Sequence, residues 1–192
     1  MLIANNLDKK FKNNSIVFVD CKVAPTKTVN AENAIFLVND KNEVHSINVL
    51  NNDAFGLSLN NKFYGLSHTQ TQTLSKLAES LGLVLKNEPK FIYAKVISRE
   101  VHPKSDKLFV LQMDKGDGKL IQLVTNTLDS EQGKVLVMAL PGSTTFSGLE
   151  IKTGKVMDVD SFGMLTGYKT LGVEKEGLIF GTNELIGKDY QF

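Results

Sequence analysis

The stretch REVHPKSDKLFVLQMDKG, residues 99–116, decides how the second half of the chain is interpreted. Residues 106–114, DKLFVLQMD, are rich in aliphatic and aromatic side chains and predict a β-strand. The residues before that strand predict a tight turn, because Pro103 fixes its own φ and favours extended backbone at the preceding residue. Ser105 and Asp106 can each accept a hydrogen bond from a nearby backbone N–H, which would stiffen the turn further.

Two interpretations of this turn stay open at this point. Lys104 and Lys107 project from it, and in the first interpretation they are simply solvated lysines on a well-formed turn. In the second, the turn is a preorganised edge that presents two positive charges and the Ser105 hydroxyl to phosphate groups.

The second half of the chain consists of short predicted strands separated by turns. The strands are expected at residues 91–101, 106–114, 119–125 and 134–140, with a last strand or hairpin within 149–162. Five short strands with a turn-like insertion after the third fit a small closed barrel, and we expect residues 90–192 to form an all-β five-stranded OB-fold barrel. In that fold, the loop between the first two strands lines the usual nucleic-acid groove.

The first half of the chain has a different pattern. Strands are predicted over residues 15–24, 33–39 and 44–50. A helix is predicted at residues 73–83, where leucine and alanine recur at helical spacing and Gly82 stands where a helix ends. Residues 1–85 are therefore expected to form a small α+β domain, and the polar, proline-containing segment 85–90 to link it to the barrel.

Length and composition indicate an ordinary globular chain. It has 192 residues, 42% of them hydrophobic, and no apolar run long enough to predict a membrane-spanning helix. The N-terminal segment is apolar first and then basic, the reverse of a secretory signal, so we expect a cytoplasmic protein with no membrane partner. Cys21, the single cysteine, suits a reducing compartment and is interpreted as a small core residue rather than a nucleophile.

The charge balance restricts the classes of partner. The net charge is +1, from 22 basic and 21 acidic side chains, whereas proteins that wrap a long duplex usually carry a clear basic excess. Residues 90–192 contain 13 basic and 13 acidic side chains, so the predicted barrel is neutral by itself. Arg99 is the single arginine, and lysine lacks the planar fork that reads guanine edges. Any nucleic-acid contact is therefore expected to follow backbone and shape.

Signatures of catalysis are missing from the sequence. The TGK at residues 153–155 lacks the upstream glycine of a phosphate-binding loop, and no G-x-S-x-G nucleophile motif is present. His45, His68 and His102 are scattered, and none has a partner at metal-ligand spacing. We therefore expect no enzyme activity, no cofactor and no metal.

A second stretch that could carry a binding function is DVDSFGMLTGYKTLG, residues 158–172. One interpretation is a glycine-permitted turn with Met164 packed in the core. The other is a strand end where close backbone approach exposes Ser161, Met164 and Lys169 beside the first turn.

Together these motifs resemble a known family. The ordered series HPKSDKL (102–108), LVTN (123–126), VMALPGSTTFSGLEI (137–151) and SFGMLTGYKTLG (161–172) is similar to the OB-fold tRNA-binding domain of YtpR-like bacterial proteins. A similar domain lies near the N-terminus of the phenylalanyl-tRNA synthetase β-subunit. The resemblance covers about residues 90–181, and residues 1–85 also look like the smaller domain that precedes this module in YtpR proteins.

The resemblance implies a non-catalytic protein that binds folded tRNA, mainly by shape and backbone. The implied RNA contacts are Lys104, Ser105, Lys107, Asn126, Ser161, Met164 and Lys169. It also implies an aminoacyl-tRNA synthetase as a partner and, because relatives dimerise, a homodimer as an alternative state. The competing hypothesis is a protein-interaction module that docks a synthetase or translation factor and has little RNA affinity, since fold does not fix function.

Overall fold

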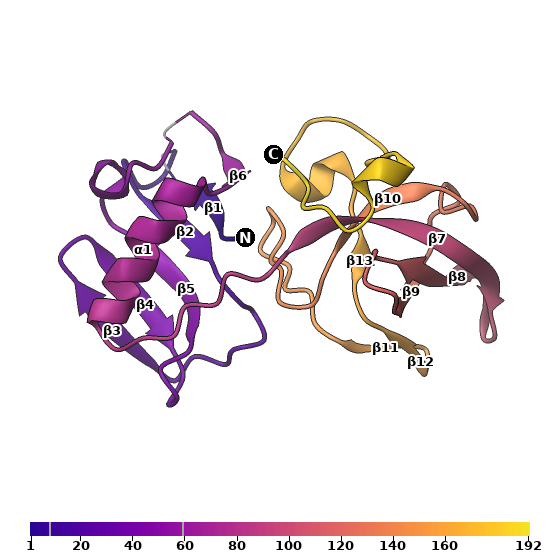
Figure 1. The fold of residues 1–192 in the computed structure, drawn as a ribbon, viewed down its shortest axis with the longest axis horizontal. Helices are drawn as coiled ribbons and strands as arrows, with labels where there is room; N and C mark the ends of the chain where they lie inside the picture. Colours follow the sequence, from indigo (N-terminus) through magenta and orange to yellow (C-terminus); the bar gives the residue numbers. More distant parts are fainter. Residues whose placement is uncertain (8, 59) are drawn as a thin grey trace. The chain divides into compact units, whose positions relative to one another are not determined.

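The computed structural model describes residues 1–7, 9–58 and 60–192, which divide into two compact units. The first unit comprises Met1–Glu88 with Phe192, and the second comprises Pro89–Gln191. Each unit is built on its own antiparallel sheet (Figure 1). No helix in the described part of the chain is long and apolar enough to cross a membrane.

The first unit contains a six-stranded antiparallel sheet in the order β3-β4-β5-β2-β1-β6. Its strands are β1 (Ile3–Asn6), β2 (Ser15–Phe18), β3 (Lys27–Ala31), β4 (Ala34–Val38), β5 (Val44–Val49) and β6 (Phe63–Gly65). Side chains along β4 alternate between buried and half-buried, as in a strand with one face on the core. Phe36 pairs with Ile47 of β5, and both are fully buried. Cys21 is also buried, as predicted for a core residue.

Helix α1 (His68–Ser80) covers one face of this sheet (Figure 1). It begins five residues before the predicted helix because Ser67 and Gln70 form a capping box, which satisfies backbone groups at the helix start. Leu74 and Ala78 point into the core, as their spacing predicts. The chain leaves the helix through Gly82, whose φ of 68° is left-handed.

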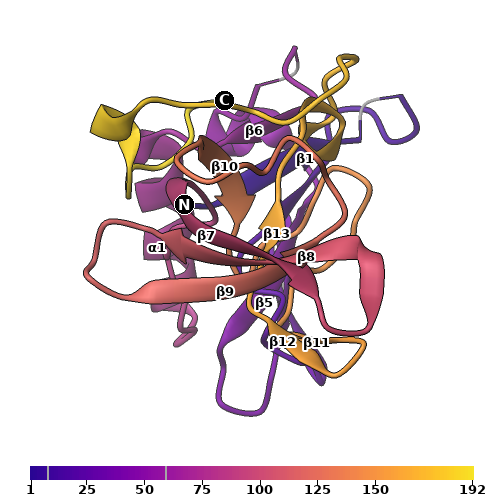
Figure 2. The same ribbon diagram turned by 90° about the vertical axis from the view of Figure 1, so that its right-hand side faces the viewer.

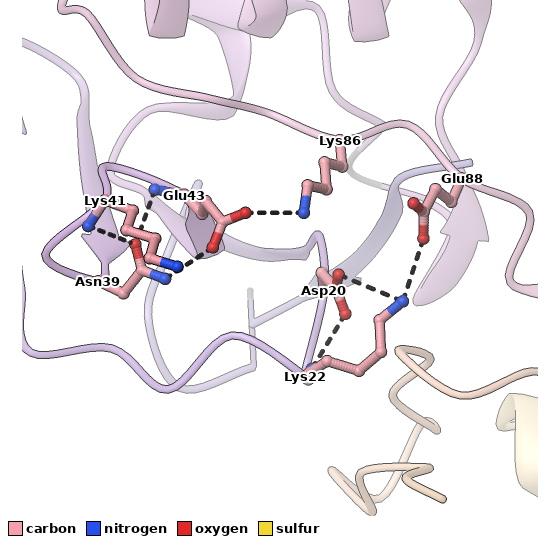
Figure 3. Close-up of polar contacts among 7 residues, drawn as sticks. All are labelled: Asp20, Lys22, Asn39, Lys41, Glu43, Lys86 and Glu88. Atoms are coloured by element: carbon pink, nitrogen blue, oxygen red, sulfur yellow. Dashed lines mark hydrogen bonds and ion pairs between the residues drawn. The ribbon is translucent and has the colours of Figure 1, made fainter.

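Ion pairs hold the end of the first unit in place (Figure 3). Lys22 Nζ lies 3.2 Å from a Glu88 carboxylate oxygen and 3.6 Å from one of the buried Asp20. Lys86 Nζ lies 2.8 Å from a Glu43 carboxylate oxygen. The first part of the predicted linker, up to Glu88, is therefore attached to the sheet of the first unit.

The second unit contains a five-stranded antiparallel sheet in the order β13-β10-β7-β8-β9. Its strands are β7 (Phe91–His102), β8 (Ser105–Asp114), β9 (Leu120–Thr125), β10 (Val135–Ala139) and β13 (Met164–Leu165). Every side chain of β10 is buried. The hydrophobic core of the second unit includes Leu111, Leu123 and Met138. The 3-10 turns are η1 (Asn52–Phe55) in the first unit and η2 (Tyr168–Leu171) and η3 (Asn183–Leu185) in the second.

The fifth strand of this sheet is not the one predicted. Strands β11 (Gly154–Val156) and β12 (Val159–Ser161), from the segment 149–162, form a separate two-stranded sheet, and β13 takes the fifth place. The physical reason is exposure: all three residues of β11 are exposed, whereas Leu165 of β13 joins the core.

The expected closure of the barrel also needs correction. No strand ladder joins the outer strands β9 and β13 within the described residues. Instead, the chain around β12 bonds to β9: the Phe162 backbone N–H donates to the Gln122 carbonyl at 2.9 Å, and Gln122 Nε2 donates to the Asp160 carbonyl at 2.8 Å. The sheet is curved (Figure 2). At this seam it is bridged by hydrogen bonds from the chain around β12 rather than by a strand ladder.

Candidate nucleic-acid interface

The turn between β7 and β8 is the first element of the candidate interface. His102 pairs with Ser105 across the hairpin, so Pro103 and Lys104 are its two connecting residues. Ser105 Oγ accepts a hydrogen bond from the Lys107 backbone N–H at 3.3 Å, the stiffening predicted for this serine. Both lysine side chains are exposed. A stiff turn thus presents two ammonium groups to solvent.

His102 connects this turn to the hairpin of β11 and β12. It is 2% exposed, its Nδ1 accepts from the Lys104 backbone N–H at 3.1 Å, and its Nε2–H donates to the Val156 carbonyl at 3.0 Å. A stiffening role was predicted for Asp106, but its exposed carboxylate makes no hydrogen bond to another described residue. That prediction was wrong, and His102 takes the role instead. The His-Pro pair at the turn was the available signal.

The tip of the β11–β12 hairpin carries backbone strain. Its two connecting residues, Met157 and Asp158, have φ of 47° and 71°. Two-residue hairpin turns of this kind favour asparagine and glycine, because left-handed backbone costs other residues about 1–2 kcal/mol. Met157 is nevertheless present there and half-exposed. A strand or hairpin was expected within 149–162, but its tip was not located, because Met157 is not a typical turn residue.

Two lysines of the candidate interface already form ion pairs with carboxylates. Lys104 forms an ion pair with Asp158 at the neighbouring hairpin tip, and Lys169 forms one with Glu176. The hydrogen bond that Lys169 donates to the Glu176 carboxylate raises the pKa of Lys169 above its ordinary value. Lys107 has no ion pair with any residue that the structure describes. Phosphates would therefore compete with carboxylates for two of these three lysines.

The side chain of the single arginine, Arg99, is also engaged in contacts within the second unit. The Arg99 guanidinium lies 3.6 Å from the centre of the Phe109 ring, and its Nη1 donates to the Leu128 carbonyl at 3.1 Å. A cation above an aromatic face is attracted by the partial negative charge on that face of the ring. Arg99 thus fixes the loop after β9 rather than standing free for base recognition.

Ser161 and the glycine that follows it have structural roles. Ser161 is 8% exposed, and its Oγ accepts from the Val124 backbone N–H at 3.1 Å, which bonds β12 to β9. A Cβ on Gly163 would lie 2.8 Å from the Ala139 carbonyl oxygen, so no other residue fits there without movement. The Ser-x-Gly spacing of the motif is thus explained by the seam and by close backbone approach.

The remaining predicted contacts lie in two places. Asn126 is exposed just after β9, and because Thr125 pairs with Phe109, it continues toward the end of β8 that holds Lys107. Met164 is half-buried in β13 and pairs with Ala139. The set near the β7–β8 tip is Lys104, Ser105, Lys107 and Asn126. The described residues contain no cluster of His, Cys, Asp and Glu that could hold a metal ion.

Comparison with known proteins places this fold in a family. Residues 91–188 match the family described as "Putative tRNA binding domain". The chain is 30% identical to the "Putative tRNA-binding protein YtpR" of Bacillus subtilis over 163 residues, 80% of this chain and 81% of that protein. It is 37% identical over 92 residues to the phenylalanine–tRNA ligase beta subunit of Novosphingobium aromaticivorans, 46% of this chain but only 12% of that subunit.

A solved MetRS-related protein from Pyrococcus horikoshii is similar over 52% of this chain and 86% of its own, at 22% identity and a TM-score of 0.38. The family match spans about half of the chain, and the Bacillus subtilis relative is similar over most of the length of both proteins. The chain therefore belongs to the family of the putative tRNA binding domain, as a YtpR-like member.

Proposed function

We propose that the protein is a non-catalytic, cytoplasmic tRNA-binding protein that contacts folded tRNA mainly by shape and backbone. The binding module is an OB-type barrel in residues 90–192, bridged at its seam by β12, and residues 1–85 form a small α+β domain beside it in the chain. One observation carries the proposal: the segment matched to the tRNA-binding family contains the stiff β7–β8 turn with exposed Lys104 and Lys107.

Each predicted contact has a role in this proposal. Lys104, Lys107 and Lys169 neutralise phosphates, and Ser105 and Asn126 hydrogen-bond to phosphate or 2′-hydroxyl groups. Met164 packs against a sugar or a base face. Ser161 acts as a positioning residue, because its hydroxyl is bonded to β9 at the seam. With the arginine already occupied, little base recognition is expected.

The expected affinity follows from the number of lysines. If roughly three to five lysines reach phosphates, log K falls against log salt with a slope of about −2 to −5. Part of the binding free energy gained from phosphate contacts is lost, because Lys104 and Lys169 must first break their ion pairs with carboxylates. We therefore expect micromolar or weaker binding at physiological salt.

The test is a titration of the purified protein with bulk tRNA at two salt concentrations, with duplex DNA as the control ligand. The triple variant of Lys104, Lys107 and Lys169 to Glu is compared with a matched triple variant of Lys119, Lys134 and Lys188 to Glu. All six lysines are exposed residues of the second unit, so both variants change its charge equally. Loss of binding in the first variant alone, at an unchanged melting temperature, supports the site. Equal affinities refute it.

A protein-interaction module remains the second candidate, favoured by the pairing of Lys104 and Lys169 with carboxylates on the same surface. On this hypothesis the chain docks an aminoacyl-tRNA synthetase or a translation factor. Salt separates the two functions, because phosphate binding weakens steeply with salt whereas an apolar protein interface barely responds. Absence of tRNA binding at low salt, together with salt-resistant binding to purified phenylalanyl-tRNA synthetase, would favour this second function.

A further inference from the structure

The loop between β1 and β2 in the first unit ends in an exposed aromatic residue among lysines. Lys9, Lys10, Phe11 and Lys12 are all exposed, and we call these four residues the KKFK tip. Phe11 is 58% exposed, more than any other phenylalanine of the described chain. A single exposed aromatic residue is common on protein surfaces, but this one stands among three exposed lysines, a combination that suits nucleic-acid binding.

Hydrogen bonds hold the described residues of this loop in place. The Leu7 backbone N–H donates to the Asn14 carbonyl at 2.9 Å, and the Phe11 N–H donates back to the Leu7 carbonyl at 2.9 Å. Asn13 adopts left-handed backbone, with a φ of 60°, and its Nδ2 donates to Asn51 Oδ1 at 2.8 Å. The Asn52 N–H donates to the Asn13 carbonyl at 2.8 Å, which ties the loop to η1. A tip held in this way loses little entropy when it binds a ligand.

The charges of the KKFK tip are not neutralised by any ion pair within residues 1–7, 9–58 and 60–192. None of its three lysines forms an ion pair with a residue in the described ranges, and the neighbouring Asp53 is bonded to Asn13 instead. In the second unit, by contrast, Lys104 and Lys169 are paired with carboxylates. The tip is therefore a concentration of free positive charge on a nearly neutral chain.

We propose that the KKFK tip binds unpaired nucleotides of RNA, with one base stacked on the Phe11 ring and neighbouring phosphates neutralised by Lys10 and Lys12. Aromatic side chains interleaved with cations are what single-stranded nucleic acid requires, because every base has a stacking face and every linkage a negative charge. A paired base inside a duplex cannot reach the ring. This site lies on the first unit and does not depend on the function proposed for the second.

The absence of tryptophan from the chain permits a direct probe. The full-length variant Phe11→Trp carries a single indole at the tip, and its emission is measured during titration with an oligouridylate of about 12 nucleotides, within the usual site size. Stacking predicts saturable quenching. In the wild-type background, Phe11→Ala weakens binding of the same oligonucleotide about five-fold or more, whereas Phe11→Tyr, which keeps a ring, retains it.

The charge requirement is tested with two matched double variants. Lys10→Glu with Lys12→Glu is compared with Lys27→Glu and Lys76→Glu, which reverse two other exposed lysines of the first unit. The tip variant is expected to abolish binding. A milder variant, Lys10→Gln with Lys12→Gln, removes two positive charges and should make the salt slope shallower by about 1.4. Equal losses in both variants would overturn the proposal, because they would indicate bulk charge alone.

Two further arms make the result decisive. The triple variant of Lys104, Lys107 and Lys169 to Glu should leave the quenching of Phe11→Trp unchanged, so failure of the tRNA site and failure of the KKFK tip are separate outcomes. Vesicles with anionic phospholipid are the competing ligand, because a basic tip with one aromatic residue also suits a membrane surface. Quenching by oligouridylate but no blue shift with vesicles supports the proposal. A blue shift with vesicles and no quenching by RNA refutes it.

Discussion

Replacing Asp158 by asparagine is expected to tighten the binding of tRNA to the second unit. Asp158 stands at the tip of the β11–β12 hairpin, where its carboxylate pairs with the Lys104 ammonium. Both side chains are more than half exposed, at 79% and 56%. Asparagine adopts left-handed backbone as readily as aspartate, so the φ of 71° does not oppose the substitution. The change therefore removes one negative charge and leaves the hairpin intact.

The magnitude follows from two terms. An exposed ion pair contributes about 0.2–1 kcal/mol, and this is regained when Lys104 no longer has to leave its carboxylate to meet a phosphate. The Asp158 carboxylate also repels an incoming phosphate, by about 0.6 kcal/mol for like charges roughly 7 Å apart in water. Together they give about 1 kcal/mol, which corresponds to a Kd about five-fold lower.

The assay is fluorescence anisotropy of labelled tRNA at constant low salt. Asp117→Asn is the control, because Asp117 also pairs with a lysine, the half-buried Lys115, at the turn between β8 and β9. In a Lys104→Ala background, the Asp158→Asn change should retain only the repulsion term. The reasoning fails if Asp158→Asn leaves the affinity unchanged, or if Asp117→Asn tightens binding to the same extent.

Three further predictions concern stability. Gly163→Ala places a Cβ against the Ala139 carbonyl and is expected to lower the free energy of unfolding by about 1–3 kcal/mol in urea; an unchanged midpoint would contradict this. Met157→Gly relieves left-handed strain and should raise the free energy of unfolding by up to about 1 kcal/mol, whereas a decrease would show that the Met157 side chain stabilises the hairpin. The hydrogen bond from Lys86 lowers the pKa of Glu43, so the pair stabilises the fold above the ordinary carboxyl pKa and loses that contribution as pH falls through the lowered value. Glu43→Gln should therefore flatten the acid side of the urea stability profile, and parallel profiles would refute the linkage.

Strands with their own apolar pattern were predictable, and strands without a clear one were not. Strands β7 to β10 appear where apolar runs between turn signals predicted them. The sequence did not reveal β1, β3 or β6, and β3 and β6 are the two edges of the first sheet. In β3, KTVNA, no side chain is fully buried, so no hydrophobic pattern marks it. Such a strand is defined by the backbone of its neighbour, which a local pattern does not contain.

In the candidate site, too, features formed by neighbouring residues were predictable, and contacts between residues far apart in the sequence were not. The turn at Pro103 is local, and both its position and the role of Ser105 in stiffening it were predictable. His102 and Ser161 have partners 54 and 37 positions away along the chain, at Val156 and Val124. Only the folded chain brings these groups together, so sequence reasoning assigned no role to His102 and treated Ser161 as an exposed RNA contact.

The ion pairs also change what a salt titration of this protein measures. A lysine that keeps a carboxylate beside it neutralises less phosphate charge and therefore releases fewer counterions than a free lysine. Lys104 and Lys169 should thus contribute less to the salt slope than Lys107, which is unpaired among the described residues. A slope near the steep end of the expected range would then require additional free cations. The KKFK tip presents three such lysines on one loop of the first unit, so reversing Lys10 and Lys12 should reduce a steep slope for tRNA but leave a shallow one unchanged.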